Sequence, residues 1–300
     1  MRFYFFLICL FLLGFGPSSM AQKKSVAEKQ TLVYKDTLAL DFYEAVSQNP
    51  KQVPLVILVH GGGFSGGTRD GESEVRFCEN LAEMGYSVAS ISYRLTRKGG
   101  SFGCDCPAEI KIETFVKASE DLADAVNFLI SQEPLSFDRS KLILAGSSAG
   151  AETVLNTVFM KDHYAFNHIK AAEFAGVVSF SGSVVNTSYI TSENVIPTLL
   201  VHGMKDRIVP FATDPHRFCT TVDPGYLILG GSESIANRLD TLNTSYILAY
   251  DPEGNHDWAG FAYEKTGLVH DFIEELILKQ EFVQSKLQIQ RNTESKESDR

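Results

Sequence analysis

The chain has 300 residues, of which 44% are hydrophobic and 21% are charged. This is ordinary globular composition, and the length is sufficient for one large domain or two small ones. The formal net charge of −10 argues against nucleic acid as a partner, because nucleic-acid-binding surfaces are basic. The acidic balance favours solubility and gives no information about small-molecule ligands.

The first 21 residues have the layout of a secretory signal peptide. Arg2 precedes a run of about a dozen apolar residues, and Ser19 and Ala21 supply the small side chains of a cleavage site. A membrane anchor is the alternative, but the run is shorter than the roughly 20 residues that a bilayer span needs. Cys9 lies inside the apolar run, which argues against lipid modification. We expect cleavage near Ala21 and a secreted or periplasmic protein without a stable membrane anchor.

Cleavage would leave four cysteines, Cys78, Cys104, Cys106 and Cys219. An even number in an exported chain permits two disulfides, with three possible pairings. A bridge between Cys104 and Cys106 would close a very small, strained ring, so we expect at least one long-range bridge and leave its pairing open. Zinc is the competing interpretation of Cys104 and Cys106, but the sequence contains no second pair of cysteines or histidines with the spacing of zinc ligands. We therefore expect neither a metal nor another cofactor.

The first half of the remaining chain predicts three strands and a helix. Residues 31–45 alternate apolar and polar side chains, as in a strand or hairpin at a sheet edge. Residues 53–59 and 86–91 are almost continuously apolar, which is typical of strands buried on both faces. A helix follows, with one apolar stripe made of Phe115, Leu122, Val126, Leu129 and Ile130.

The second half continues the alternation of strands and helices. Four further strands are predicted, within residues 141–147, 174–180, 196–203 and 245–251. Three helices are predicted at residues 149–160, 232–242 and 269–277. This order indicates one doubly wound α/β domain with a mostly parallel sheet, spanning residues 22–284. Residues 285–300 are polar and charged and are expected to form a disordered tail.

Chemically informative residues follow four of the predicted strands. The sequences are HGGGF at 60–64, GSSAG at 146–150, GMKD at 203–206 and EGNHDW at 253–258. In sheets of this kind, ligands bind at the carboxyl ends of the strands. These four segments are therefore expected to lie near one another.

The segment GSSAG has the spacing of a strand-to-helix turn that exposes a serine. In G-x-S-x-G the third residue is the exposed serine, here Ser148, and Ser147 occupies the variable second position. A larger residue at Gly146 or Gly150 would collide with neighbouring backbone. A plain tight turn is the alternative, but the three glycines of HGGGF favour a reactive site, because unhindered N–H groups there can stabilise an oxyanion. Serine, aspartate and histidine in this order are what nucleophilic acyl transfer requires.

These motifs resemble those of α/β-hydrolase-fold serine esterases of the HGGG type, which are related to carboxylesterases, acetyl esterases and hormone-sensitive-lipase-like enzymes. The resemblance extends from about residue 31 to residue 283 and implies an eight-stranded, mostly parallel sheet. It implies Ser148 as nucleophile, Asp206 as the acid of a catalytic triad and His256 as base. The oxyanion donors it implies are the N–H groups of Gly62, Gly63 and Ala149.

The sequence departs from the family pattern at two positions, Ser147, where many relatives have an acidic residue, and Ala151, where many have glycine. These two departures affect the start of the helix and the preference for acyl groups more than the catalytic reaction itself. The remaining alternatives are Asp251 or Asp257 as the acid and His216 as the base. We interpret His60, His202 and Glu152 as structural, the last because a carboxylate suits a helix N-terminus.

The resemblance also bears on the substrate. Many relatives have a cap domain, but the interval between residues 182 and 196 is short, so we expect no large cap and an open site. Residues 96–109 and 211–226 form the longest rims, and whether they make a lid stays open. We expect a short-chain acyl ester, free or attached to a polymer, as substrate. One alternative is an acetyl or feruloyl esterase that acts on polysaccharide. A prolyl-oligopeptidase-like peptidase is less expected, because such enzymes usually carry an extra N-terminal domain. The least expected alternative is a non-catalytic binding relative. Acyl and alcohol specificity and oligomeric state are not predicted.

Overall fold

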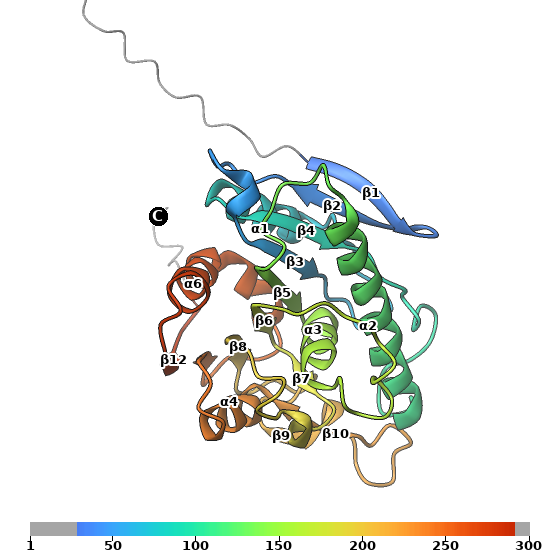
Figure 1. Cartoon of the computed structure of the whole chain (residues 1–300). Helices are drawn as coiled ribbons and strands as arrows, with labels where there is room; N and C mark the ends of the chain where they lie inside the picture. Colours follow the sequence, from blue (N-terminus) through green and yellow to red (C-terminus); the bar gives the residue numbers. More distant parts are fainter. Residues whose placement is uncertain (1–28, 292–300) are drawn as a thin grey trace, which may run out of the picture.

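A computed structural model describes residues 29–291, and a nine-stranded sheet forms its centre (Figure 1). The strand order is β1-β2-β4-β3-β5-β6-β8-β11-β12. The strands are β1 (Lys29–Lys35), β2 (Leu38–Tyr43), β3 (Leu55–Val59), β4 (Ser87–Ile91), β5 (Leu142–Ser147), β6 (Gly176–Phe180), β8 (Thr198–Gly203), β11 (Tyr246–Asp251) and β12 (Gln284–Gln288). The pair β1–β2 and the pair β2–β4 are antiparallel, and all the other pairs are parallel. The expected mostly parallel α/β architecture is confirmed.

Alternate residues of the central strands enter different hydrophobic clusters. In β3, Leu55, Ile57 and Val59 belong to one cluster, whereas Val56 and Leu58 belong to the other. Successive side chains of a strand point to opposite faces, so each face of the sheet has its own core. Burial on both faces explains why these strands have no polar alternation in the sequence.

Helices cover both faces of the sheet (Figure 1). Helices α2 (Ala108–Ser131), α3 (Ala149–Phe159) and α4 (Ser232–Thr241) supply buried side chains to the first cluster. Helices α1 (Glu72–Glu83), α5 (Trp258–Phe261) and α6 (Thr266–Phe272) supply the second, together with the π-helical segment Ile273–Leu278. Short 3-10 turns occur at Pro50–Gln52, Thr187–Tyr189, His216–Phe218 and Ala262–Glu264. Helix α1 was not predicted from the sequence.

Strand β12 corrects two expectations. The sheet has nine strands where eight were expected, and the segment from residue 285 is a strand rather than the start of a tail. Residues 284–288 pair in parallel with residues 246–250 of β11. All of these residues except Leu287 are polar, and most are exposed, so the backbone pairing of this strand leaves no apolar pattern in the sequence. The expected signal peptide, residues 1–21, lies outside the described residues.

A second, three-stranded sheet contains β7 (Ser183–Val184), β10 (Ile228–Gly231) and β9 (Thr213–Pro215) in that order. It forms from short segments that follow β6 and β8 in the chain. Within residues 29–291 no large cap domain interrupts the main fold, as expected. Nor does this part of the chain contain a helix that is both long and apolar enough to cross a bilayer.

A disulfide joins the two rim loops that the sequence analysis identified. It links Cys104 to Cys219, which are 115 residues apart in sequence, so the expected long-range bridge is confirmed. A hydrogen bond at Gly225 also joins the loops, since its N–H donates to the carbonyl of Cys104 at 2.8 Å. The carbonyl of Gly225 accepts from Nζ of Lys111, in α2, at 2.7 Å. Cys78 and Cys106 are buried free thiols.

Removal of this bridge by Cys104→Ser should lower the free energy of unfolding by about 2–4 kcal/mol, because the bridge closes a long loop in the unfolded chain. Urea unfolding of the variant and the wild type measures the difference. Thiol titration of denatured protein provides the control: the mature chain should show two reactive thiols without reductant and four with it. Four thiols without reductant would contradict the bridge.

Candidate active site

Ser148 lies in a strained turn between β5 and α3. Its φ is 50° and its ψ is −118°, a conformation that residues with a side chain rarely adopt. The turn is held because α3 begins very close to the end of β3: a Cβ atom at Gly150 would lie 2.0 Å from the carbonyl oxygen of Val59. The N–H of Ser148 also donates to the carbonyl of Phe180 at 2.8 Å. The small residues around Ser148 are therefore required by the close packing that holds its hydroxyl out of the sheet.

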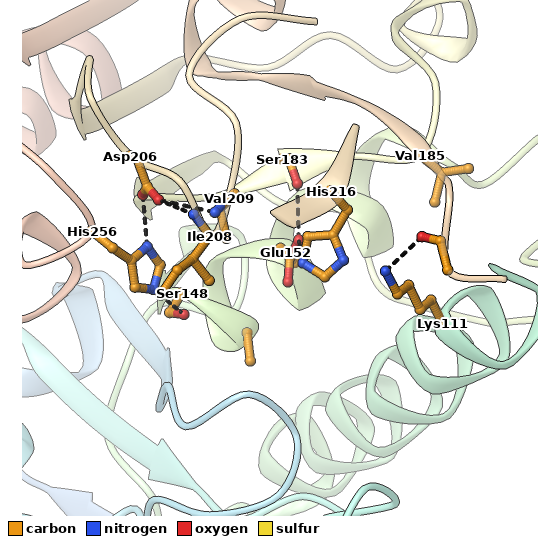
Figure 2. A network of polar contacts seen from close by, with 12 residues as sticks. Lys111, Ser148, Glu152, Ser183, Val185, Asp206, Ile208, Val209, His216 and His256 are labelled. Carbon is orange, nitrogen blue, oxygen red and sulfur yellow. Dashed lines mark hydrogen bonds and ion pairs between the residues drawn. The ribbon is translucent and has the colours of Figure 1, made fainter. Parts of the chain in front are cut away.

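Ser148, His256 and Asp206 form one chain of hydrogen bonds (Figure 2). The distance from Ser148 Oγ to His256 Nε2 is 2.8 Å, and that from His256 Nδ1 to Asp206 Oδ2 is 2.6 Å. Asp206 follows β8 and His256 follows β11, so three strand ends supply the three side chains. The carboxylate fixes the imidazole with Nε2 toward the serine, which is the geometry needed to accept a proton from the hydroxyl.

Four donors surround the buried carboxylate of Asp206. Oδ1 accepts from the N–H groups of Ile208 at 2.8 Å and Val209 at 3.0 Å, and Oδ2 accepts from His256 and from His202 Nε2 at 3.1 Å. Burial acts to raise the pKa of Asp206, but the hydrogen bonds from the two histidines outweigh it and hold the pKa well below its usual range. Asp206 is therefore ionised near neutral pH.

His202 is a partner of Asp206 as well as a structural residue. Its Nε2 faces two acceptors, Asp206 Oδ2 at 3.1 Å and the carbonyl of Val209 at 3.2 Å, so this nitrogen carries the hydrogen. Nδ1 is then free to accept from Ser232 Oγ at 2.8 Å. The side chain is fully buried. His202 is thus structural, as interpreted from the sequence, and the structure adds that its bond orients the carboxylate of Asp206.

The glycines of HGGGF form a loop beside Ser148. A Cβ atom at Gly61 would lie 3.4 Å from the Cβ of Ser148. Gly62 has a φ of 114°, which an L side chain rarely adopts. Within residues 29–291, the N–H groups of Gly62, Gly63 and Ala149 donate no hydrogen bond. Unengaged N–H groups next to a nucleophile can bind a developing negative charge.

The other residues considered from the sequence take no part in the hydrogen-bond chain of Ser148, His256 and Asp206. Ser147 Oγ donates to the carbonyl of Ala259 at 2.7 Å, and Asp251 accepts from Trp258 Nε1 at 2.8 Å. Asp257 is exposed beyond the end of β11. The ring of His60 stacks on Tyr93 with centroids 4.6 Å apart. None of these four makes a hydrogen bond to Ser148 or His256 in the described structure.

Glu152 and His216 form a buried pair next to the Ser148 chain, with Lys111 on its far side in Figure 2. His216 Nε2 lies 3.9 Å from Glu152 Oε1, which also accepts from Ser183 Oγ at 2.9 Å. Burial raises the pKa of Glu152 to about 8 and lowers the pKa of His216 well below its usual range. Both groups are therefore neutral near pH 7. Glu152 is structural, as expected, but as a protonated acid rather than as a carboxylate at a helix N-terminus.

A pocket of about 750 Å³ opens above Ser148. Its walls include the glycine loop, His256, Phe102 from one rim and Arg217 from the other. Phe102 packs against Phe64, Phe115 and His216 and is 7% exposed, so it belongs to the wall. Phe211, from the second rim, packs on His202 with ring centroids 5.6 Å apart and does not line the pocket. Arg217 was not singled out from the sequence, because a lone arginine in a loop gives no periodic or motif signal.

The described residues contain no group of three or more histidine, cysteine, aspartate or glutamate side chains arranged to hold a metal ion.

The raised pKa of Glu152 predicts how stability depends on pH. Glu152 keeps its proton in the folded protein between about 4.5 and about 8, whereas in the unfolded chain it has lost it. The free energy of unfolding should therefore fall as pH rises through this range, by up to about 1.4 kcal/mol per pH unit from this group. Glu152→Gln keeps the acceptor for Ser183 and should remove this dependence. Chemical denaturation at pH 5, 6.5 and 8 tests it, with the exposed Glu193→Gln as control. Parallel profiles for all three proteins would contradict the prediction.

Comparison with known proteins gives the same fold. Residues 40–184, just under half of the chain, match the BD-FAE family model. An esterase from the planctomycete Thermogutta terrifontis with butyrate bound has a TM-score of 0.59 and 18% identity, covering 83% of this chain and 94% of that one. The same esterase phosphorylated by paraoxon has a TM-score of 0.58, 19% identity and the same coverage. No curated protein matches the sequence. The chain therefore has the α/β-hydrolase fold of these esterases.

Proposed function

We propose that this protein hydrolyses short-chain carboxylic esters outside the cytoplasm, with Ser148 as nucleophile, His256 as general base and Asp206 as the acid of the triad. The observation that carries the proposal is the unbroken hydrogen-bond chain from Ser148 Oγ through His256 to Asp206, on the wall of an open pocket. A serine hydroxyl is a weak nucleophile at neutral pH, and this arrangement supplies the base that activates it.

In acylation, Ser148 Oγ attacks the ester carbonyl carbon while its proton moves to His256 Nε2. The carbonyl oxygen becomes an oxyanion, for which the N–H groups of Gly62, Gly63 and Ala149 are the proposed donors. The tetrahedral intermediate then expels the alcohol, which takes the proton from His256, and the acyl group remains on Ser148. The ionised carboxylate of Asp206 stabilises the imidazolium that forms during the step.

In deacylation, a water molecule attacks the acyl carbon and gives a proton to the same imidazole nitrogen. The second oxyanion uses the same N–H groups, and its collapse releases the carboxylic acid and returns the proton to Ser148. Fixed donors that do not reorganise during the reaction contribute more than solvent would, and losing one typically lowers turnover by about 10²–10³-fold. The backbone conformation of Gly62 favours such fixed donors.

The proposal of short acyl groups rests on the shape of the site. No cap covers the pocket within the described part of the chain, so little apolar wall is available for a long acyl chain. The similar Thermogutta esterase has been solved with butyrate and with propionate bound. An open mouth also suits acetyl or feruloyl groups carried by a polysaccharide, which is the second candidate substrate class.

We propose export on two grounds. The first 21 residues have signal-peptide composition, and the chain contains a disulfide, which persists in oxidising compartments.

Ser148 is expected to be the residue that organophosphates label. Ser148→Ala should lower kcat by about 10⁴-fold or more and should abolish labelling, because the triad then has no nucleophile. Ser147→Ala is the matched control, since its hydroxyl is engaged with the carbonyl of Ala259, and it should retain both labelling and turnover. Peptide mapping of the labelled protein by mass spectrometry identifies the residue. Label on Ser147 would refute the assignment.

Catalytic efficiency is expected to be highest for acetyl to butyryl esters. Burial of each CH₂ contributes about 0.8 kcal/mol only where a wall excludes water, so carbons beyond the first few should add no transition-state binding. Measurement of kcat/KM for p-nitrophenyl esters from C2 to C12 tests this, with a peptide p-nitroanilide as control for peptidase activity. A maximum at C8 or longer would mean that the rim loops enclose the acyl chain.

A further inference from the structure

Arg217 is an unpaired cation in the pocket that contains Ser148. Among the described residues lining that pocket, it is the one arginine or lysine. Its side chain forms no ion pair or hydrogen bond with any other residue of the described structure, and its Nε atom is buried without a partner. A buried donor of a charged group is costly to leave unsatisfied, so this Nε–H group favours an acceptor from outside the protein.

The guanidinium lies beside the glycine loop. A Cβ atom at Gly63 would lie 3.9 Å from Arg217 Nη2. Gly63 follows Gly61 and Gly62, and this loop adjoins Ser148. An ester whose carbonyl is presented to Ser148 would therefore have the guanidinium close to its acyl or alcohol part.

The backbone holds Arg217 in this place. Arg217 has a φ of 56° and Phe218 has a φ of 54°, two consecutive left-handed residues with side chains. Such conformations cost of order 1 kcal/mol each and persist where the surroundings fix them. Here the N–H of Arg217 donates to the carbonyl of Ile208 at 3.1 Å, and the disulfide at Cys219 anchors the chain two residues later.

No carboxylate of the site neutralises Arg217. Asp206 is committed to four donors, and Glu74, which lines the same pocket, forms no ion pair with Arg217 in the described structure. Glu152 interacts with Arg217 electrostatically, but burial raises the pKa of Glu152 to about 8, so near pH 7 it carries a proton. The positive charge therefore remains available to a ligand.

We propose that Arg217 binds a carboxylate on the substrate, and hence that the preferred substrates are esters with a free carboxylate on their acyl or alcohol part. This inference rests on the proposed esterase function. A guanidinium presents a planar pair of donors that match the two oxygens of a carboxylate. A single cation, with the acidic Glu74 elsewhere on the wall, suits a monoanion better than the dianion of a phosphate monoester.

Isosteric substrate pairs test the proposal. Monoethyl succinate and ethyl levulinate differ by a carboxylate oxygen and a methyl group at the end of the acyl chain. The pair 4-acetoxybenzoate and 4-acetoxyacetophenone makes the same exchange on the alcohol side. We expect wild-type kcat/KM to favour the carboxylate member of at least one pair by about 10- to 100-fold, the usual size for a hydrogen bond to a charged group.

Substitution of Arg217 should remove this selectivity. With Arg217→Gln the ratio of the two kcat/KM values should fall to near one, mainly through a higher KM for the carboxylate ester. Arg217→Lys keeps the charge but not the paired donors, so it should retain part of the ratio. Arg207→Gln is the matched control: Arg207 is exposed, stacks on Phe218 at 4.6 Å and does not line the pocket, so its ratio should equal that of the wild type.

The outcomes separate the inference from the function on which it rests. Turnover of the neutral esters with equal kcat/KM for both members of both pairs would overturn the role of Arg217 and leave the esterase function standing. This comparison uses wild-type protein, so it does not depend on whether a variant folds. Full selectivity in Arg217→Gln would also overturn the proposal. Failure of the wild type to hydrolyse any of the four esters would remove both.

Discussion

The close approach of α3 to the end of β3 is the constraint on which the site depends. Gly150 passes so near the carbonyl of Val59 that no side chain fits between them, and the chain can turn from β5 into α3 only through the strained conformation of Ser148. The glycine loop after β3 lies alongside Ser148. One packing requirement thus accounts for both the exposed hydroxyl and its neighbouring loop.

Two buried carboxyl groups near this turn have opposite charge states. Asp206 receives four hydrogen bonds and remains ionised, whereas Glu152 receives one from Ser183 and keeps its proton near pH 7. The number of donors, more than the depth of burial, separates them. Of these two carboxyl groups, only Asp206, which hydrogen-bonds to His256, is therefore negatively charged near pH 7.

Features with a local signature could be predicted from the sequence. The buried strands, the helix α2 stripe, the residues that form the Ser148–His256–Asp206 chain and the existence of a long-range disulfide all have one. Strand β12 has none, because its residues are polar except for Leu287 and do not alternate with apolar ones. Helix α1 was not predicted, despite the spacing of Phe77 and Leu81. The protonation of Glu152 and the unpaired state of Arg217 depend on neighbours distant in sequence, which spacing does not reveal.

The bridge between Cys104 and Cys219 ties together the two rim loops of the pocket, and the bonds of Gly225 to Cys104 and Lys111 add to this connection. Loops tied in this way have little freedom to move apart. In the proposed ester hydrolysis, no contact with an oil–water surface would then be needed to uncover Ser148. We therefore expect no interfacial activation, so the rate should not rise when an ester begins to form micelles.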